Sequence, residues 1–236
     1  MPTTTVHFDA ILFDMDGTLI DSTAGVVGAW ELFAQTYPGL DVHDILSSSH
    51  GVRTVDNLRK HCGIDDPEEL EREAERFEQA IVTTSKEGGR QGIVLLPGAR
   101  DILSELAPYS RLPNPRWTVC TSATRVYATA ALGTTGVEPP ETMVYAEDVA
   151  KGKPFPDPYL LGAKRVGATP ENCLVVEDAP AGVRSGVAAG CKTLALVTTH
   201  SREQLEACNP DYIVPNLASV TMKADDTGVL VTITTP

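Results

Sequence analysis

The strongest constraint on the fold of this chain is the alternation of short apolar runs with segments of helical spacing. The apolar runs predict buried strands at 10–13, 117–121, 173–177 and 192–197, with a further short strand near 143–145. Helical patterns separate them, at 99–107, 125–132 and 179–189. Strands that alternate with helices predict an α/β fold, in which a doubly wound parallel sheet is covered on both faces.

One long stretch interrupts this alternation. Residues 22–92 are almost entirely helical in pattern, so we predict a Rossmann-like core made of 1–21 and 93–236 and an inserted α-helical cap subdomain at 22–92. Within the insertion, the mostly charged run 68–78 predicts a solvated helix face. At the end of the chain, apolar alternation on both sides of Asp225-Asp226-Thr227-Gly228 predicts a β-hairpin.

Charge and composition limit the classes of partner that this chain can bind. The 236 residues include 19 Lys and Arg against 32 Asp and Glu, for a net charge of −13. This excess disfavours nucleic acid or an anionic membrane as the main partner, because both need a basic surface.

No apolar run approaches the roughly 18 residues that span a bilayer. The start of the chain lacks the pattern of a secretory signal, and five widely spaced cysteines favour neither disulfides nor a zinc site. We expect a cytoplasmic protein, a monomer or a weak oligomer.

Acidic residues follow two of the predicted strands. Asp14 and Asp16 come after the first strand, in Asp14-Met15-Asp16-Gly17-Thr18, and Glu177 and Asp178 end the strand at 173–177. Ligands of open parallel sheets bind outside the carboxyl ends of the strands, so these acids are expected to converge. Adjacent acids at the end of a buried strand are unfavourable unless they bind a cation, and carboxylates suit Mg²⁺. Taken alone, D-x-D-G also occurs in calcium loops and ordinary turns.

Phosphate-binding groups follow other predicted elements. Thr121 and Ser122 close the strand at 117–121, and Lys153 lies between glycine and proline in a loop. A hydroxyl, a neighbouring N–H and an ammonium group suit the oxygens of a phosphate. Each signal has an ordinary alternative, since Ser and Thr commonly cap helices and a lone lysine is usually solvated.

In this order, the acid pair, hydroxyl, lysine and second acid pair resemble the four motifs of the haloacid dehalogenase superfamily of phosphotransferases. The resemblance covers nearly the whole chain, because the helical insertion resembles the mobile cap of that family. The stretches 50–54, 152–159 and 177–182 are similar to glycerol-phosphate and 2-deoxyglucose-6-phosphate phosphatases. The C-terminal hairpin favours the second of these groups.

The resemblance implies roles for the acids. Asp14 is the implied nucleophile, which forms an aspartyl-phosphate, and Asp16 is the implied general acid and then base. Dehalogenases of the family lack this second acid, so Asp16 favours phosphorus chemistry. The implied Mg²⁺ ligands are Asp14, the Asp16 carbonyl and Asp178, with Glu177 as a further ligand or as a partner of one.

The resemblance also implies how the substrate is held. Thr121, the N–H of Ser122 and Lys153 are implied to bind the phosphoryl oxygens. In the insertion, His50 and Arg53 are implied to reach the leaving group, although both also suit the start of a helix.

These features together predict a Mg²⁺-dependent phosphatase of a small sugar or polyol phosphate, such as 2-deoxyglucose-6-phosphate, glycerol phosphate or a sugar-alcohol phosphate. One alternative is a sugar-phosphate mutase of the β-phosphoglucomutase type, which returns the phosphoryl group to its substrate. The other is a non-catalytic regulator that binds a phosphorylated metabolite, which an intact nucleophile disfavours. The sequence does not choose among the substrates.

Overall fold

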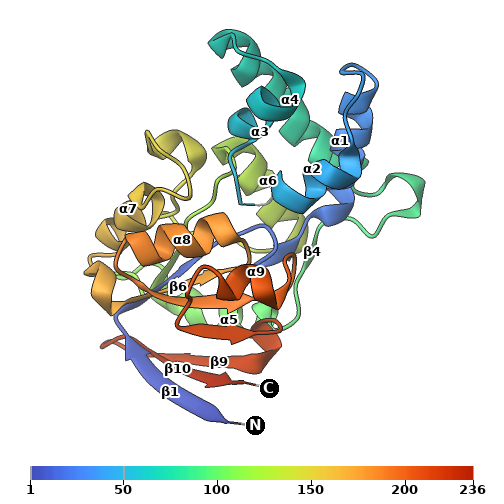
Figure 1. Ribbon diagram of the computed structural model, residues 1–236. Helices are drawn as coiled ribbons and strands as arrows, with labels where there is room; N and C mark the ends of the chain where they lie inside the picture. Colours follow the sequence, from blue (N-terminus) through green and yellow to red (C-terminus); the bar gives the residue numbers. More distant parts are fainter. Residues whose placement is uncertain (1, 50, 236) are drawn as a thin grey trace.

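The central layer is a parallel sheet with the strand order β5-β2-β6-β7-β8. The structure is a computed structural model that describes residues 2–49 and 51–235 (Figure 1). The strands are β2 (Ala10–Phe13), β5 (Trp117–Val119), β6 (Cys173–Glu177), β7 (Lys192–Leu196) and β8 (Tyr212–Val214), and each neighbouring pair is parallel. Strands β2 and β6 are buried at every position, because a sheet covered on both faces needs continuous rather than alternating apolar runs.

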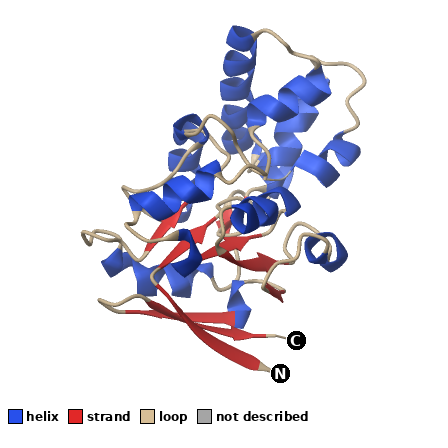
Figure 2. Cartoon of the chain, turned by 60° about the vertical axis from the view of Figure 1, so that its left-hand side comes forward, coloured by secondary structure: helices blue, strands red, loops and turns tan. Residues whose placement is uncertain are grey.

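Helices cover both faces of this sheet, as predicted (Figure 2). They are α5 (Ala99–Leu106), α6 (Arg125–Thr135), α7 (Asp157–Arg165), α8 (Pro180–Ala188) and α9 (Arg202–Glu206). Successive side chains of a strand point to opposite faces, and β2 shows this directly. Ile11 and Phe13 belong to one apolar cluster, while Ala10 and Leu12 belong to another. The doubly wound α/β fold is therefore confirmed.

The helical insertion consists of α1 (Thr23–Ala34), α2 (Val42–Ser49), α3 (Thr54–Cys62) and α4 (Pro67–Thr84), which lie together at the top of Figure 1. Aromatic rings hold α1 against α4: the Trp30 and Phe77 centroids are 4.5 Å apart, and those of Phe33 and Phe77 are 5.0 Å apart. Helix α4 begins at Pro67 because Asp66 caps it and the proline occupies its first turn.

Two short strands connect the insertion to the rest of the chain. Strands β3 (Ile20–Asp21) and β4 (Val94–Leu95) pair antiparallel, so the chain enters and leaves the helical region at the same place. The boundaries of the cap subdomain, 22–92, stay a prediction.

A second sheet has the order β1-β10-β9 and carries both ends of the described chain (Figure 1). Strands β9 (Val220–Ala224) and β10 (Val229–Thr234) form the predicted hairpin, and β1 (Thr3–Phe8), which the sequence did not indicate, pairs with β10. The inward-facing residues Val229, Val231 and Ile233 join the main apolar cluster. This sheet lies at the opposite end of the molecule from α1–α4.

One sequence prediction about local structure was wrong, and another holds only in part. The region near 143–145 forms only an isolated bridge between Cys120 and Val144, so the predicted strand does not form. The charged residues of the run 68–78 are exposed or half-buried, as predicted, except Glu78, which is 3% exposed and lies on the buried face with Leu70, Ala74 and Phe77. One face of α4 packs against the other helices, and the charge count of a segment does not reveal its faces.

All five cysteines are free thiols, and four of them are buried. In the ranges 2–49 and 51–235, no helix is both long enough and apolar enough to cross a membrane.

Candidate active site

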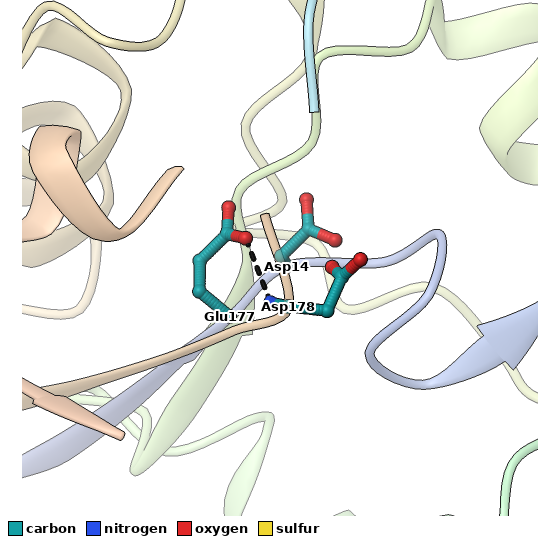
Figure 3. Close-up of side chains that lie close together, drawn as sticks. All are labelled: Asp14, Glu177 and Asp178. Atoms are coloured by element: carbon teal, nitrogen blue, oxygen red, sulfur yellow. Dashed lines mark hydrogen bonds between the residues drawn. The ribbon is translucent and has the colours of Figure 1, made fainter. Parts of the chain in front are cut away.

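Three buried carboxylates meet at the carboxyl ends of β2 and β6. Asp14 follows β2, and Glu177 and Asp178 end and follow the neighbouring strand β6 (Figure 3). Each offers an oxygen within 4.8 Å of the others, and their exposed fractions are 4%, 0% and 1%. The parallel pairing of β2 with β6 brings together residues more than 160 positions apart, as the sheet-edge rule predicts.

Lys153 is a buried partner of these acids rather than a surface lysine. Its Nζ lies 2.5 Å from Asp14 Oδ1 and 2.7 Å from Glu177 Oε1. Burial alone lowers the pKa of the Lys153 ammonium group, but the Asp14 and Glu177 carboxylates outweigh burial and raise that pKa. Lys153 is therefore charged when it contacts these acids.

One ammonium group does not balance three buried carboxylates. The pKa of Asp14 is raised to about 7, because burial, Glu177 and Asp16 together outweigh the lowering effect of Lys153. Burial, Glu177 and Asp14 raise the pKa of Asp178 well above its ordinary value. A cluster of hard oxygen donors with uncompensated negative charge fits a divalent cation such as Mg²⁺.

Hydrogen-bond donors of the protein occupy the acceptor positions of both Glu177 carboxylate oxygens. Glu177 Oε1 accepts hydrogen bonds from Lys153 Nζ and from Tyr159 Oη at 2.9 Å. Its Oε2 accepts from the backbone N–H groups of Asp178 at 2.9 Å and Ala179 at 3.0 Å. A Cβ on Gly182 would collide with this carboxylate, so its space is closed as well. Two donors fill the lone pairs of each oxygen, and Glu177 acts in this arrangement as an anchor for Lys153.

Asp178 keeps acceptor capacity that Glu177 lacks. Thr18 Oγ1 donates to its Oδ1 at 3.0 Å, and Thr199 Oγ1 donates to its Oδ2. Each oxygen then has one donor and one further lone pair. Gly17, at φ +85°, lies directly against this side chain, and only glycine tolerates both that backbone conformation and that proximity.

Asp16 is held by one of its two oxygens. Its Oδ1 accepts hydrogen bonds from Ser22 Oγ at 2.6 Å and Tyr127 Oη at 2.7 Å. Burial raises the pKa of Asp16, against the opposing effect of these two hydrogen bonds. Burial and Asp16 raise the pKa of Tyr127 well above its ordinary value, so the phenol stays a donor. Sequence reasoning missed Tyr127, since a tyrosine on a helix carries no local signal of a partner 111 positions away.

Thr121 and Ser122 border the same pocket as Asp14 and Asp16. Thr121 Oγ1 accepts from Ala123 N–H at 3.1 Å, which is a local turn and not the helix cap of the alternative interpretation, since Thr124 caps α6. Ser122 Oγ donates to the backbone oxygen of Gly51 at 2.9 Å. The predicted phosphate-binding loop therefore also contacts the helical insertion.

Of the two residues of the insertion that were predicted to reach the substrate, the structure describes one. Arg53 precedes α3, and its Nε lies 2.8 Å from Asp56 Oδ2. Its side chain lies against Gly152, where an added Cβ would approach Arg53 Cδ to 2.9 Å. The structure thus brings Arg53 beside the loop that carries Lys153. Arg53 itself does not line the pocket. His50 lies outside the described residues.

The pocket has a volume of about 80 Å³ and two different walls. One wall is made of Asp14, Asp16, Thr121, Ser122, Ala123 and Tyr127. The other comes from the helical insertion, through Val26, Trp30, Val52, Thr54, Asn57, Phe77, Glu78 and Ile81. Trp30 is buried in the helical core, and it also borders the pocket. Glu78 was missed, although it interrupts the apolar face of α4 formed by Ala74, Phe77 and Ile81.

Comparison with known proteins agrees with this geometry. A family model for haloacid dehalogenase-like hydrolases matches residues 8–190. Hexitol phosphatase A of Escherichia coli (strain K12) is 37% identical over 92% of this chain and 95% of its own length. This chain belongs to the haloacid dehalogenase-like hydrolase family, and the resemblance identified from the motifs is confirmed.

Further relatives act on different compounds. Glycerol-1-phosphate phosphohydrolase 1 of Saccharomyces cerevisiae is 33% identical, over 93% of this chain and 88% of the relative. The 2-deoxyglucose-6-phosphate phosphatase 1 of the same organism is 28% identical, over 97% and 96%. Among solved structures, a hydrolase from Pseudomonas syringae superposes with a TM-score of 0.74 at 28% identity, over 89% of this chain and 94% of that one.

Proposed function

We propose that this chain is a Mg²⁺-dependent phosphatase that hydrolyses a small polyol or sugar phosphate through an aspartyl-phosphate. The observation that carries the proposal is the pair of aspartates at one strand end. Asp14 is held by Lys153 through Oδ1, and Asp16 is held by Ser22 and Tyr127 through Oδ1. Each has its other oxygen available for chemistry. The hexitol, glycerol and 2-deoxyglucose phosphatases among its relatives support the substrate class.

In the first step, a carboxylate oxygen of Asp14 attacks phosphorus while the bond from phosphorus to the leaving oxygen breaks. Asp16 gives its proton to that oxygen, so that a neutral alcohol departs. In the second step, Asp16 takes a proton from water, the water oxygen attacks phosphorus, and the bond to Asp14 breaks. Phosphate leaves and both aspartates return to their starting states.

The remaining residues bind and orient. An ammonium group has three N–H donors, and Lys153 uses two of them on Asp14 and Glu177. Its third donor, Thr121 and the N–H of Ser122 hold the phosphoryl oxygens. Asp14, Asp178 and the Asp16 carbonyl hold the metal, while Glu177 fixes Lys153. When bound, Mg²⁺ polarises the phosphoryl group and offsets the negative charge of the site.

The helical insertion, 22–92, acts as a cap over this site. Its contacts with the sheet side, such as Ser122 to Gly51, support a closed arrangement that excludes bulk water. Arg53 and His50 belong to the cap, and Arg53 lies beside the loop that carries Lys153, away from the pocket wall that contains Glu78. Five free thiols support a reducing location, the cytoplasm, and the protein acts there as a monomer or weak oligomer.

The experiment that tests this function is phosphate release from a panel of polyol and sugar phosphates, with Mg²⁺ and after chelation. We expect release from hexitol, glycerol or deoxyhexose phosphates only with Mg²⁺. A mutase gives isomerised sugar phosphate without net phosphate release, and a regulator binds substrate without turnover. Either result contradicts the proposal.

A further inference from the structure

Glu78 is a buried carboxylate in the wall of the pocket that faces the proposed leaving group. It lies on α4, is 3% exposed and lines the same pocket as Asp16. Thr54 Oγ1 donates to its Oε1 at 2.8 Å, and Thr124 donates to it twice, from N–H to Oε1 at 3.3 Å and from Oγ1 to Oε2. The proposed mechanism gives this residue no part.

The hydrogen bonds of Glu78 favour its anionic form. The pKa of Glu78 is raised, because burial and Asp16 outweigh the lowering effect of the bonds from Thr124 and Thr54. Thr124 is also the residue that caps α6, and the first turn of a helix stabilises a nearby negative charge. Two donors on Oε1 and one on Oε2 occupy three of about four acceptor positions of a carboxylate. One position on Oε2 is left for a substrate hydroxyl.

The surroundings of Glu78 offer no compensation for a second anion. Trp30, Phe77 and Ile81 give this wall apolar surfaces, and Asn57 adds an amide. None of the described residues that line the pocket is Lys or Arg. A carboxylate or a second phosphate on the leaving group would enter a pocket of low polarity beside Glu78 and Asp16, where repulsion is strong. A neutral hydroxyl would instead donate to Glu78.

We infer that Glu78 selects an uncharged, hydroxyl-bearing leaving group and excludes one that carries a second anionic group. This inference rests on the proposed phosphatase function and adds the charge of the substrate's second half. It also bears on the mutase alternative, because such an enzyme must hold a bisphosphate in its pocket. Glu78 is a specificity residue: it contacts the leaving group and takes no part in bond making.

The test compares two substrates that differ in the charge of the leaving group, glycerol 3-phosphate and 3-phosphoglycerate. The variant is Glu78→Gln, which keeps the shape and removes the charge. The matched control is Glu75→Gln, which removes the same charge from an exposed position of the same helix. For each protein, kcat/KM is measured on both substrates, and their ratio expresses the selectivity.

We expect the wild type and Glu75→Gln to prefer glycerol 3-phosphate to the same degree. In Glu78→Gln the ratio should fall by roughly tenfold to a hundredfold, the range of a hydrogen bond to a charged group. An equal loss on both substrates, with the ratio unchanged, overturns the inference, because it shows a structural role only. No phosphate release by the wild type from any polyol or sugar phosphate contradicts the proposed function instead.

A second variant covers the case in which Glu78→Gln does not fold. Glu78→Asp keeps the charge and withdraws it by one methylene group. It should lose kcat/KM on glycerol 3-phosphate while 3-phosphoglycerate remains a poor substrate. Improved turnover of 3-phosphoglycerate by this variant contradicts the inference.

Discussion

The two walls of the pocket differ in how their charges are arranged. On the sheet wall, Asp14 borders the pocket and clusters with Glu177 and Asp178, and the buried Lys153 pairs with Asp14 and Glu177. On the helical wall, Glu78 is the one carboxylate among the described lining residues, and apolar side chains surround it. A dense cluster suits metal binding and phosphoryl transfer, whereas an isolated anion suits selection of a neutral group. The comparison assigns chemistry to the sheet wall and substrate choice to the helical wall.

The largest effect is expected on the sheet wall, from Asp14→Asn. Phosphate release should fall by about 10³-fold or more, because an amide does not replace the nucleophile. The melting temperature should not fall, since one of three crowded buried carboxylates becomes neutral while Lys153 keeps Glu177. Phosphate release and thermal unfolding measure the two effects. Retained turnover in Asp14→Asn would contradict a chemical role for the sheet wall.

The next effect concerns the metal. Saturating Mg²⁺ should raise the stability of the wild type by about 2.7 kcal/mol at a hundred times its Kd, and chelation should abolish both this gain and activity. Asp178→Asn should lose most of the Mg²⁺-dependent rise in melting temperature, because it removes a ligand charge. An unchanged rise in Asp178→Asn would show that the ion binds elsewhere.

A smaller effect is expected from Tyr127→Phe, which removes one of the two hydrogen bonds to Asp16 Oδ1. A hydrogen bond to a charged group contributes about 1.5–3 kcal/mol, so kcat should fall by roughly tenfold or more while KM changes little. The matched control is Tyr37→Phe, because Tyr37 Oη donates to Glu73 at 3.0 Å within the helical insertion. Equal effects of the two variants on kcat would refute a positioning role for Tyr127.

The smallest effect is expected from Asp66→Ala at the start of α4. Asp66 accepts a hydrogen bond from Glu69 N–H at 2.9 Å, and loss of such a cap costs about 1 kcal/mol. Chemical denaturation should show this loss, and kcat with saturating substrate should stay unchanged. A large fall in kcat would show that the stability of the helical wall and the chemistry are not separable.

The sequence was sufficient where the signal is local. The runs at 10–13 and 173–177 are strands at those positions, and their polar ends meet because parallel pairing brings the carboxyl ends of strands to one edge. The start of α4 likewise depends on a local signal, the cap residue Asp66 followed by Pro67. These features depend on residues that lie close together in the chain.

Sequence reasoning failed where partners are distant. Strand β1 begins with three exposed threonines, and only its pairing with β10 makes it a strand. The bond from Tyr127 to Asp16 likewise joins segments that only the fold brings together. The filled acceptor positions of Glu177 depend on Lys153 and Tyr159, which come from a loop and a helix.

The sequence by itself determined the fold class, the family and the strand-end residues of the site. Apolar periodicity and motif order are written in short stretches of chain, so no tertiary information is needed to interpret them. The tertiary structure alone decided which face of α4 is buried, and with it whether Glu78 is a solvated charge or part of the pocket. The physical reason is that burial and hydrogen-bond partners are properties of the packed helices, and the same charged run in another packing would face water.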